Sequence, residues 1–134
     1  AGYPTVFAYF ARFEVNRIME LAGHLPHLAR PLQDLASRMV DMLPLVREHV
    51  AHPDFEGSFS LKKVAPALVG SSYADMAVGD GGTAAAKLAQ LLLAPDTLEE
   101  DPAQLRKDLL AYCEQDTQVL VDLHRKLAEL GAAD

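Results

Sequence analysis

Residues 5–10 read Thr-Val-Phe-Ala-Tyr-Phe, a short apolar and aromatic run directly after Pro4. Its length and composition predict a buried β-strand. The strand is followed with almost no loop by residues 12–22, in which apolar side chains recur at roughly helical spacing until Gly23. A strand that passes straight into a helix is typical of an α/β fold.

Helix signals outnumber strand signals in the rest of the chain. The apolar run Val40–Val46 predicts a second strand, which we place at a sheet edge because Pro44 cannot donate to a ladder. The remaining expected segments are a helix from about Pro31 to Met39, a loop over 49–59, a helix from Leu61 to about Leu68 capped by Ser60, a turn over 79–82, and a helix capped by Thr83 that continues to about Leu93.

The clearest element is a final helix that begins after Asp101 and ends at Gly131. Asp101 is a typical N-cap, Pro102 stands at the first helical position, and Gln104 lies three residues after the cap. One face carries the stripe Leu105, Leu109, Tyr112, Asp116, Leu120, Leu123, Leu127 and Leu130. We therefore expect residues 1–134 to form a single helix-rich α/β domain with about two short strands and four to six helices.

Composition points to a soluble folded protein. Half of the 134 residues are apolar and 23% are charged, which suits one compact domain without long disordered tracts. We find no apolar run long enough to span a bilayer and no secretion signal at the N-terminus. Since the single cysteine, Cys113, cannot form an internal disulfide, a reducing cytoplasm is the expected location.

The net charge of −7 argues against binding of nucleic acid through a broad basic surface. An enzyme that contacts phosphate through metal ions needs clustered carboxylates instead. Asp116 is one candidate, because it lies on an apolar helix face where a carboxylate is costly unless paired or bound to metal. Tyr112 lies one turn earlier on that face. The alternative role for Asp116 is a core aspartate bonded to a backbone group or an arginine.

Glu14 is the second candidate carboxylate. It lies about one turn into the helix that follows the first strand, and ligands of open α/β sheets collect outside the carboxyl ends of strands. The alternative is that Glu14 only complements the positive N-terminus of its helix.

The segment Tyr112-Cys-Glu-Gln-Asp116 followed by a leucine-rich continuation resembles the third motif of the DEDD superfamily of 3′-to-5′ exonucleases, in its tyrosine form. Residues 6–14, ending in Phe13-Glu14, look like the second motif, in which a strand runs into Asn-x-x-Phe-Asp/Glu. The run Val40–Leu45 and the Ser-Leu-lysine helix start within residues 58–68 are similar to the segments that follow in these enzymes. The four segments occur in the expected order.

Residues His52–Val64 match the string His-Pro-Asp-Phe-x-Gly-Ser-Phe-Ser-x-Lys-Lys-Val of an uncharacterised bacterial family whose C-terminal domain is ribonuclease H-like. The resemblance runs from about Thr5 to Leu130. It implies metal-dependent hydrolysis of phosphodiester bonds in DNA or RNA, with Mg²⁺ or Mn²⁺ held by Glu14 and Asp116. Tyr112 would orient or help to deprotonate the attacking water, and Lys62, Lys63 and Phe13 would contact a single-stranded end.

Two departures weaken the match. Phe10 stands where the second motif has Asn, which removes a polar group near the site. The first motif, Asp-x-Glu, has no counterpart, because residues 5–10 align with the fourth strand of the fold. We therefore expect the chain to begin partway through its domain, to have little exonuclease activity alone, and to form a homodimer that covers the exposed strand edge.

Two other functional classes stay open. The chain could be a non-catalytic helical interaction module derived from a nuclease, which Phe10 and the missing motif favour. Alternatively, two His-x-x-His pairs, at residues 24 and 27 and at residues 49 and 52, could bind a transition metal, although histidines beside prolines are usually surface groups.

Overall fold

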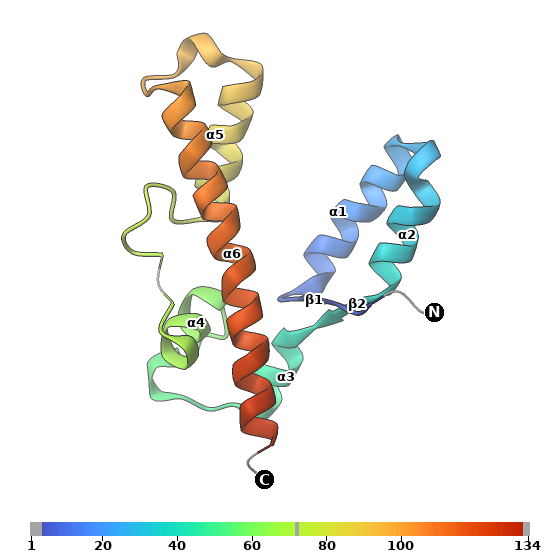
Figure 1. The fold of residues 1–134 in the computed structure, drawn as a ribbon, viewed down its shortest axis with the longest axis vertical. Helices are drawn as coiled ribbons and strands as arrows, with labels where there is room; N and C mark the ends of the chain where they lie inside the picture. The colour runs from blue at the N-terminus through green and yellow to red at the C-terminus, as the bar shows by residue number, and fades with distance from the viewer. Residues whose placement is uncertain (1–3, 72, 133–134) are drawn as a thin grey trace. The chain divides into compact units, whose positions relative to one another are not determined.

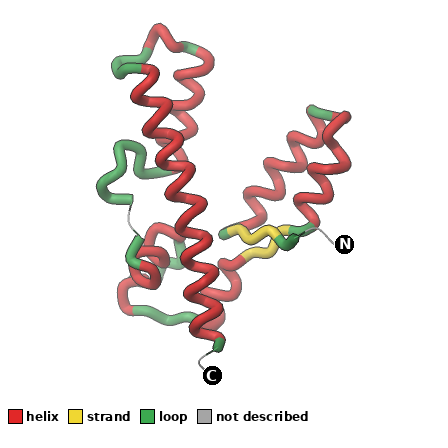
Figure 2. Tube along the Cα trace, viewed as in Figure 1, coloured by secondary structure: helices red, strands yellow, loops and turns green. Residues whose placement is uncertain are grey.

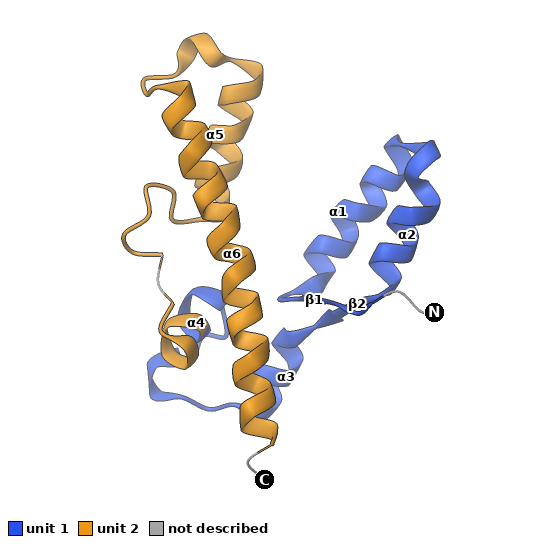
Figure 3. Cartoon of the chain, viewed as in Figure 1, with its two compact units in different colours: residues 1–64 blue, residues 65–134 orange. Residues whose placement is uncertain are grey.

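The computed structural model describes residues 4–71 and 73–132, and the chain divides into two compact units, Ala1–Val64 and Ala65–Asp134 (Figure 3). Six α-helices and two β-strands form within the described ranges (Figure 1). The predicted helix-rich α/β composition is therefore confirmed. None of the described helices is both long and apolar enough to cross a membrane.

The sheet of the first unit consists of two parallel strands, β1 (Val6–Ala8) and β2 (Met39–Asp41). Parallel neighbours need a crossover connection, which is supplied here by α1 (Ala11–His24), a 3-10 turn and α2 (Ala29–Ser37). The two helices lie side by side and both start or end at the sheet (Figure 2). The first predicted strand is thus present, although shorter than residues 5–10.

The prediction that Val40–Val46 forms a strand is wrong beyond Asp41, where α3 (Met42–His49) begins. The Asp41 side chain accepts the Leu43 N–H at 3.0 Å and so caps this helix. Pro44 lies in the first helical turn, where its missing N–H is not needed. Met42 and Val46, four residues apart, are both buried, so the apolar run follows a helical period.

Asp41 also caps the start of α1. Its two carboxylate oxygens accept the N–H groups of Phe10 at 2.9 Å and Ala11 at 3.0 Å. Phe10 is the N-cap of α1 and has left-handed backbone angles, with φ 63° and ψ 50°. One carboxylate therefore ties together the ends of both strands and the starts of two helices.

The expected loop after α3 is an ordered turn. His52 Nδ1 accepts the Asp54 N–H at 3.2 Å and caps a 3-10 turn at Pro53–Phe55. Glu56 and Gly57 then take positive φ values and reverse the chain, and Phe55 is buried. The Tyr9 hydroxyl donates to the Phe59 carbonyl at 2.6 Å, which fixes the turn to the end of β1. Helix α4 (Leu61–Val69) follows, close to its predicted range.

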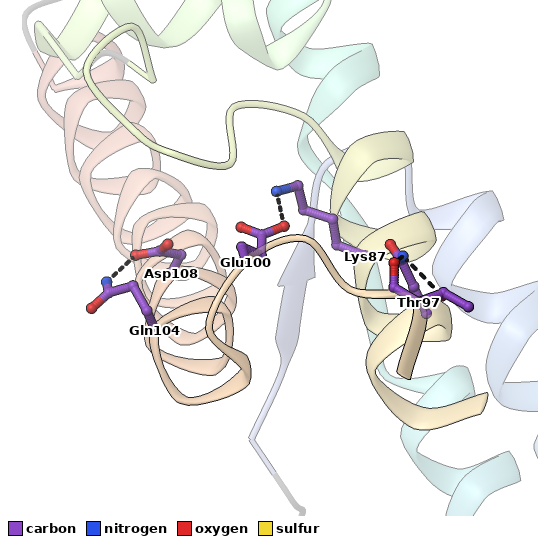
Figure 4. A network of polar contacts seen from close by, with 6 residues as sticks. Lys87, Thr97, Glu100, Gln104 and Asp108 are labelled. Carbon is purple, nitrogen blue, oxygen red and sulfur yellow. Dashed lines mark hydrogen bonds and ion pairs between the residues drawn. The ribbon is translucent and has the colours of Figure 1, made fainter. Parts of the chain in front are cut away.

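The second unit contains a helical hairpin of α5 (Gly81–Leu93) and α6 (Pro102–Gly131). The N-cap of α5 is Asp80, not Thr83 as predicted, because the Asp80 carboxylate accepts both the N–H of Thr83 at 2.8 Å and its hydroxyl at 2.6 Å. In the connection between the helices, Gln90 donates to the Thr97 carbonyl at 2.9 Å and Lys87 pairs with Glu100 (Figure 4).

Helix α6 begins as predicted, with the Asp101 side chain accepting the Gln104 N–H at 3.0 Å. The side chain of Gln104 donates to Asp108, one turn further along the helix, at 2.9 Å (Figure 4). The buried residues of this helix are Leu105, Leu109, Tyr112, Val119 and Leu123. Val119 thus occupies the buried position expected for Leu120, and Leu130 is exposed.

Candidate functional site

The polar centre of the second unit is Asp116, which is half-buried on α6. The Tyr73 hydroxyl donates to Asp116 Oδ1 at 2.7 Å. The rings of Tyr73 and Tyr112 lie 6.2 Å apart between centroids, and both residues are buried. Asp116 is therefore paired, as a carboxylate on an apolar face requires, but its partner is a tyrosine rather than a backbone group or an arginine.

Both tyrosines are held in their protonated form. Burial raises the pKa of Tyr112 to about 12, and its hydrogen bond to Asp116 and the negative charges of Asp116 and Asp80 add to the shift. Burial also raises the pKa of Tyr73 well above its usual value, again with help from Asp116. Each phenol is consequently a hydrogen-bond donor at neutral pH and not a base.

A groove of about 440 Å³ between α5 and α6 ends at this cluster, with Tyr112, Cys113 and Asp116 on its wall. Cys113 is exposed and reduced. The rest of the wall is mainly apolar and includes Leu88, Leu91, Leu92, Leu109 and Leu110. The site thus combines one oriented carboxylate with an apolar surface.

Glu14 and Phe13 lie in the first turn of α1 in the first unit, and both side chains are exposed. The guanidinium of Arg17 lies over the Phe13 ring, 5.7 Å from its centroid. Since Asp116 belongs to the second unit, the approach of Glu14 to Asp116 stays a prediction.

The two lysines proposed to contact phosphate are exposed in the first turn of α4. Lys63 forms an ion pair with Glu56, the residue at the variable position of the matched string. A phosphate bound by Lys63 would have to compete with this carboxylate, and an exposed pair of this kind is weak. The role of Lys62 is untested.

The histidine pairs do not assemble a metal centre in the described parts of the chain, which contain no group of three or more His, Cys, Asp or Glu side chains able to hold an ion. His52 uses Nδ1 to cap the turn that follows it. Asp116 and Glu14 each carry carboxylate oxygens of the type that Mg²⁺ prefers, and each would need further ligands to hold that ion.

Tyr73 and Asp41 were not predicted as key residues. Tyr73 lies 43 positions from Asp116 in a segment without periodicity, so no spacing links the two. Asp41 carried a usable signal. An aspartate at the start of an apolar run is a common helix cap, because its side chain can accept the backbone N–H two residues later.

Comparison with known proteins adds one match. Residues 2–60 match the model of a family described as Domain of unknown function (DUF2779). The match covers most of the first unit and excludes Tyr112 and Asp116. No curated protein and no solved structure matches the chain.

Proposed function

We propose that this chain supplies the second and third acidic motifs of a metal-dependent 3′-to-5′ exonuclease of the ribonuclease H-like fold. The observation that carries the proposal is the hydrogen-bonded pair of Tyr73 and Asp116 beside Tyr112, at the end of an open groove. A half-buried carboxylate held by a phenol is pre-oriented for a ligand, whereas a surface aspartate is not. The parallel strand followed at once by α1 and Glu14 is also consistent with this fold.

In the proposed site, Asp116 and Glu14 would hold Mg²⁺ or Mn²⁺, which would supply positive charge against the phosphodiester oxygens. Tyr73 fixes the rotamer of Asp116. Tyr112 keeps its proton, which its hydrogen bond directs to Asp116, and the phenol oxygen would accept a hydrogen bond from the water that it orients. This role replaces the proton removal that the motif first implied. The substrate is the single-stranded end of DNA or RNA.

Metal binding can be measured without an activity assay. The single cysteine, Cys113, lines the same groove as Asp116 and can carry a probe. A fluorine-bearing tag on Cys113 should lose its NMR signal to paramagnetic broadening when Mn²⁺ binds near Asp116. We expect Asp116→Asn to weaken this effect at least about tenfold. Glu114→Gln, on the same helix and exposed, is the matched control and should behave as the wild type.

The same titration tests the shared site. If Glu14 is a ligand of the same ion, Glu14→Gln should weaken broadening at Cys113, while Glu20→Gln on the same helix should not. Loss in Asp116→Asn with no change in Glu14→Gln would show that Glu14 holds no part of this ion. Absence of broadening in the wild type at millimolar Mn²⁺ would refute the proposal as a whole.

A metal-dependent assay on labelled single-stranded DNA and RNA tests the reaction. Because no Asp-x-Glu precedes the second motif within residues 1–134, we expect little activity from them alone. Robust hydrolysis that is lost in Asp116→Ala would show instead that the first acidic motif is dispensable.

A second function, a non-catalytic interaction module, is favoured by one observation. Five leucines of the helical hairpin are exposed, namely Leu88, Leu92, Leu93, Leu110 and Leu130. Exposed apolar side chains in such number are typical of surfaces that bind other proteins. Failure to bind Mn²⁺ would leave this function as the better account of the second unit.

A further inference from the structure

The first unit contains a pocket that is lined by none of the catalytic, metal-binding or substrate-binding residues proposed above. It has a volume of about 640 Å³ and lies between the end of β1, α3 and the turn before α4. We propose that this pocket binds a nucleotide, with Arg47 and the serine hydroxyls at the phosphate and the aromatic rings at the base. The residues that carry the argument are Tyr9, Phe10, Arg47, Ser58, Phe59 and Ser60.

Arg47 is the cation of the pocket. It is exposed in the last turn of α3 and also lines an adjoining pocket of about 390 Å³. None of the ion pairs among residues 4–71 and 73–132 involves it. Two carboxylates of the first unit are engaged elsewhere, since Asp41 accepts three backbone N–H groups and Glu56 pairs with Lys63. Glu48, which lines the adjoining pocket with Arg47, is paired with His49. A guanidinium in this state presents a planar set of donors that suits phosphate.

The start of α4 also favours an anion in this pocket. Ser58 and Ser60 line it immediately before the first residue of α4. The N-terminus of a helix carries partial positive charge and directs backbone N–H groups toward a bound anion. Arg47 and the start of α4 therefore act on the same space.

The aromatic rings of the pocket indicate the other part of the ligand, a base. Phe10 is 54% exposed, and its backbone N–H donates to Asp41, which holds the main chain at this position. An exposed ring beside an arginine is the arrangement on which nucleic acid bases stack without sequence preference. The volume of the pocket lies within the range that holds small ligands. The choice of a nucleotide rather than another phosphorylated ring compound rests on the proposed function.

The test is a titration of isotope-labelled protein, followed by NMR in the presence of EDTA, with adenosine monophosphate, adenosine and inorganic phosphate as separate probes. We expect the amide signals of Gly57 and Ser58 to shift, and the monophosphate to bind at least about tenfold tighter than either fragment. Arg47→Gln should reduce the affinity for the monophosphate to about the affinity for adenosine. Arg47→Lys should lose less of this affinity. Phe10→Leu should reduce the affinity about tenfold.

Arg30→Gln, an exposed arginine on α2, is the matched control and should leave binding unchanged. Equal binding of the three probes, or an unchanged affinity in Arg47→Gln with a native circular dichroism spectrum, would overturn the proposal. Asp116→Asn separates the two proposals, because it should weaken Mn²⁺ binding at least about tenfold but leave nucleotide binding intact. If Mn²⁺ fails to bind while the monophosphate binds through Arg47, the exonuclease proposal is refuted and the nucleotide-binding proposal is supported.

Discussion

At the scale of single residues, Phe10 shows how backbone conformation and sequence can disagree. The position has left-handed angles, which are costly for a bulky side chain and readily adopted by asparagine. Asparagine is the residue that the second exonuclease motif has at this point. Asparagine at position 10 would therefore adopt this backbone conformation at a lower cost than Phe10 does.

We predict that Phe10→Asn stabilises the first unit by about 0.5–1 kcal/mol, because it relieves a left-handed strain of about 1–2 kcal/mol at the cost of some apolar contact. Phe13→Asn is the control, because Phe13 is 55% exposed, close to the 54% of Phe10, but has no positive φ. The control should destabilise slightly through its lower helix propensity. Urea unfolding measures both, and a less stable Phe10→Asn would show that the ring contributes more than the strain costs.

Tyr9 gives a prediction about pH. Burial and the charge of Asp41 raise its pKa from the usual 10.0 to about 12, partly offset by Arg47. The folded state therefore keeps this proton where the unfolded chain releases it. The stabilising effect is complete below pH 10 and is lost as the pH rises through 12.

We accordingly expect the urea midpoint of the wild type to fall between pH 10 and 12. Tyr9→Phe should be less stable below pH 10, because it loses the bond to the Phe59 carbonyl, and its midpoint should fall less steeply above pH 10. Parallel curves for the two proteins would contradict the assignment to Tyr9.

At the scale of elements, Asp41 is the residue on which most of the first unit depends. Its carboxylate caps two helices, and each cap of this type contributes about 1 kcal/mol. Asp41→Ala should therefore destabilise the unit by about 2 kcal/mol. Asp34→Ala, which breaks only an exposed pair with Arg38, should cost less than about 0.5 kcal/mol. Equal midpoints for the two variants in urea would refute the double cap.

The sequence predicted an element well where its apolar residues follow a single clear pattern. Asp101, Pro102 and the long apolar stripe fixed the start and face of α6, and the strand into α1 was recognised from residues 5–10. The run Val40–Val46 was misassigned, because a short apolar segment fits a strand or a buried helix equally well. The cap at Asp41 decided the outcome, and two of its three bonds reach residues about thirty positions earlier.

At the scale of the whole molecule, the candidate site was predicted only within one element. Tyr112 and Asp116 share a face because helical geometry alone brings them together. Their third partner, Tyr73, depends on tertiary packing that no spacing encodes. The prediction that Glu14 joins them spans both units and awaits the Mn²⁺ titration.

Self-association is the prediction that belongs to this scale. The described sheet has only two strands, and a small sheet with open edges favours pairing with a second copy. We expect light scattering to give the mass of a dimer at micromolar concentration and a mass that falls on dilution. A constant mass of one chain, 14.6 kDa, would contradict the prediction.

The parallel pairing of β1 and β2 also has a kinetic consequence. The ends joined through Asp41 lie 31 positions apart, so the ladder can form only after a long segment has closed. Helices α1 and α2 contact each other within that segment and can pair locally first. We expect refolding of the first unit to begin with this helical pair, with the sheet completed afterwards.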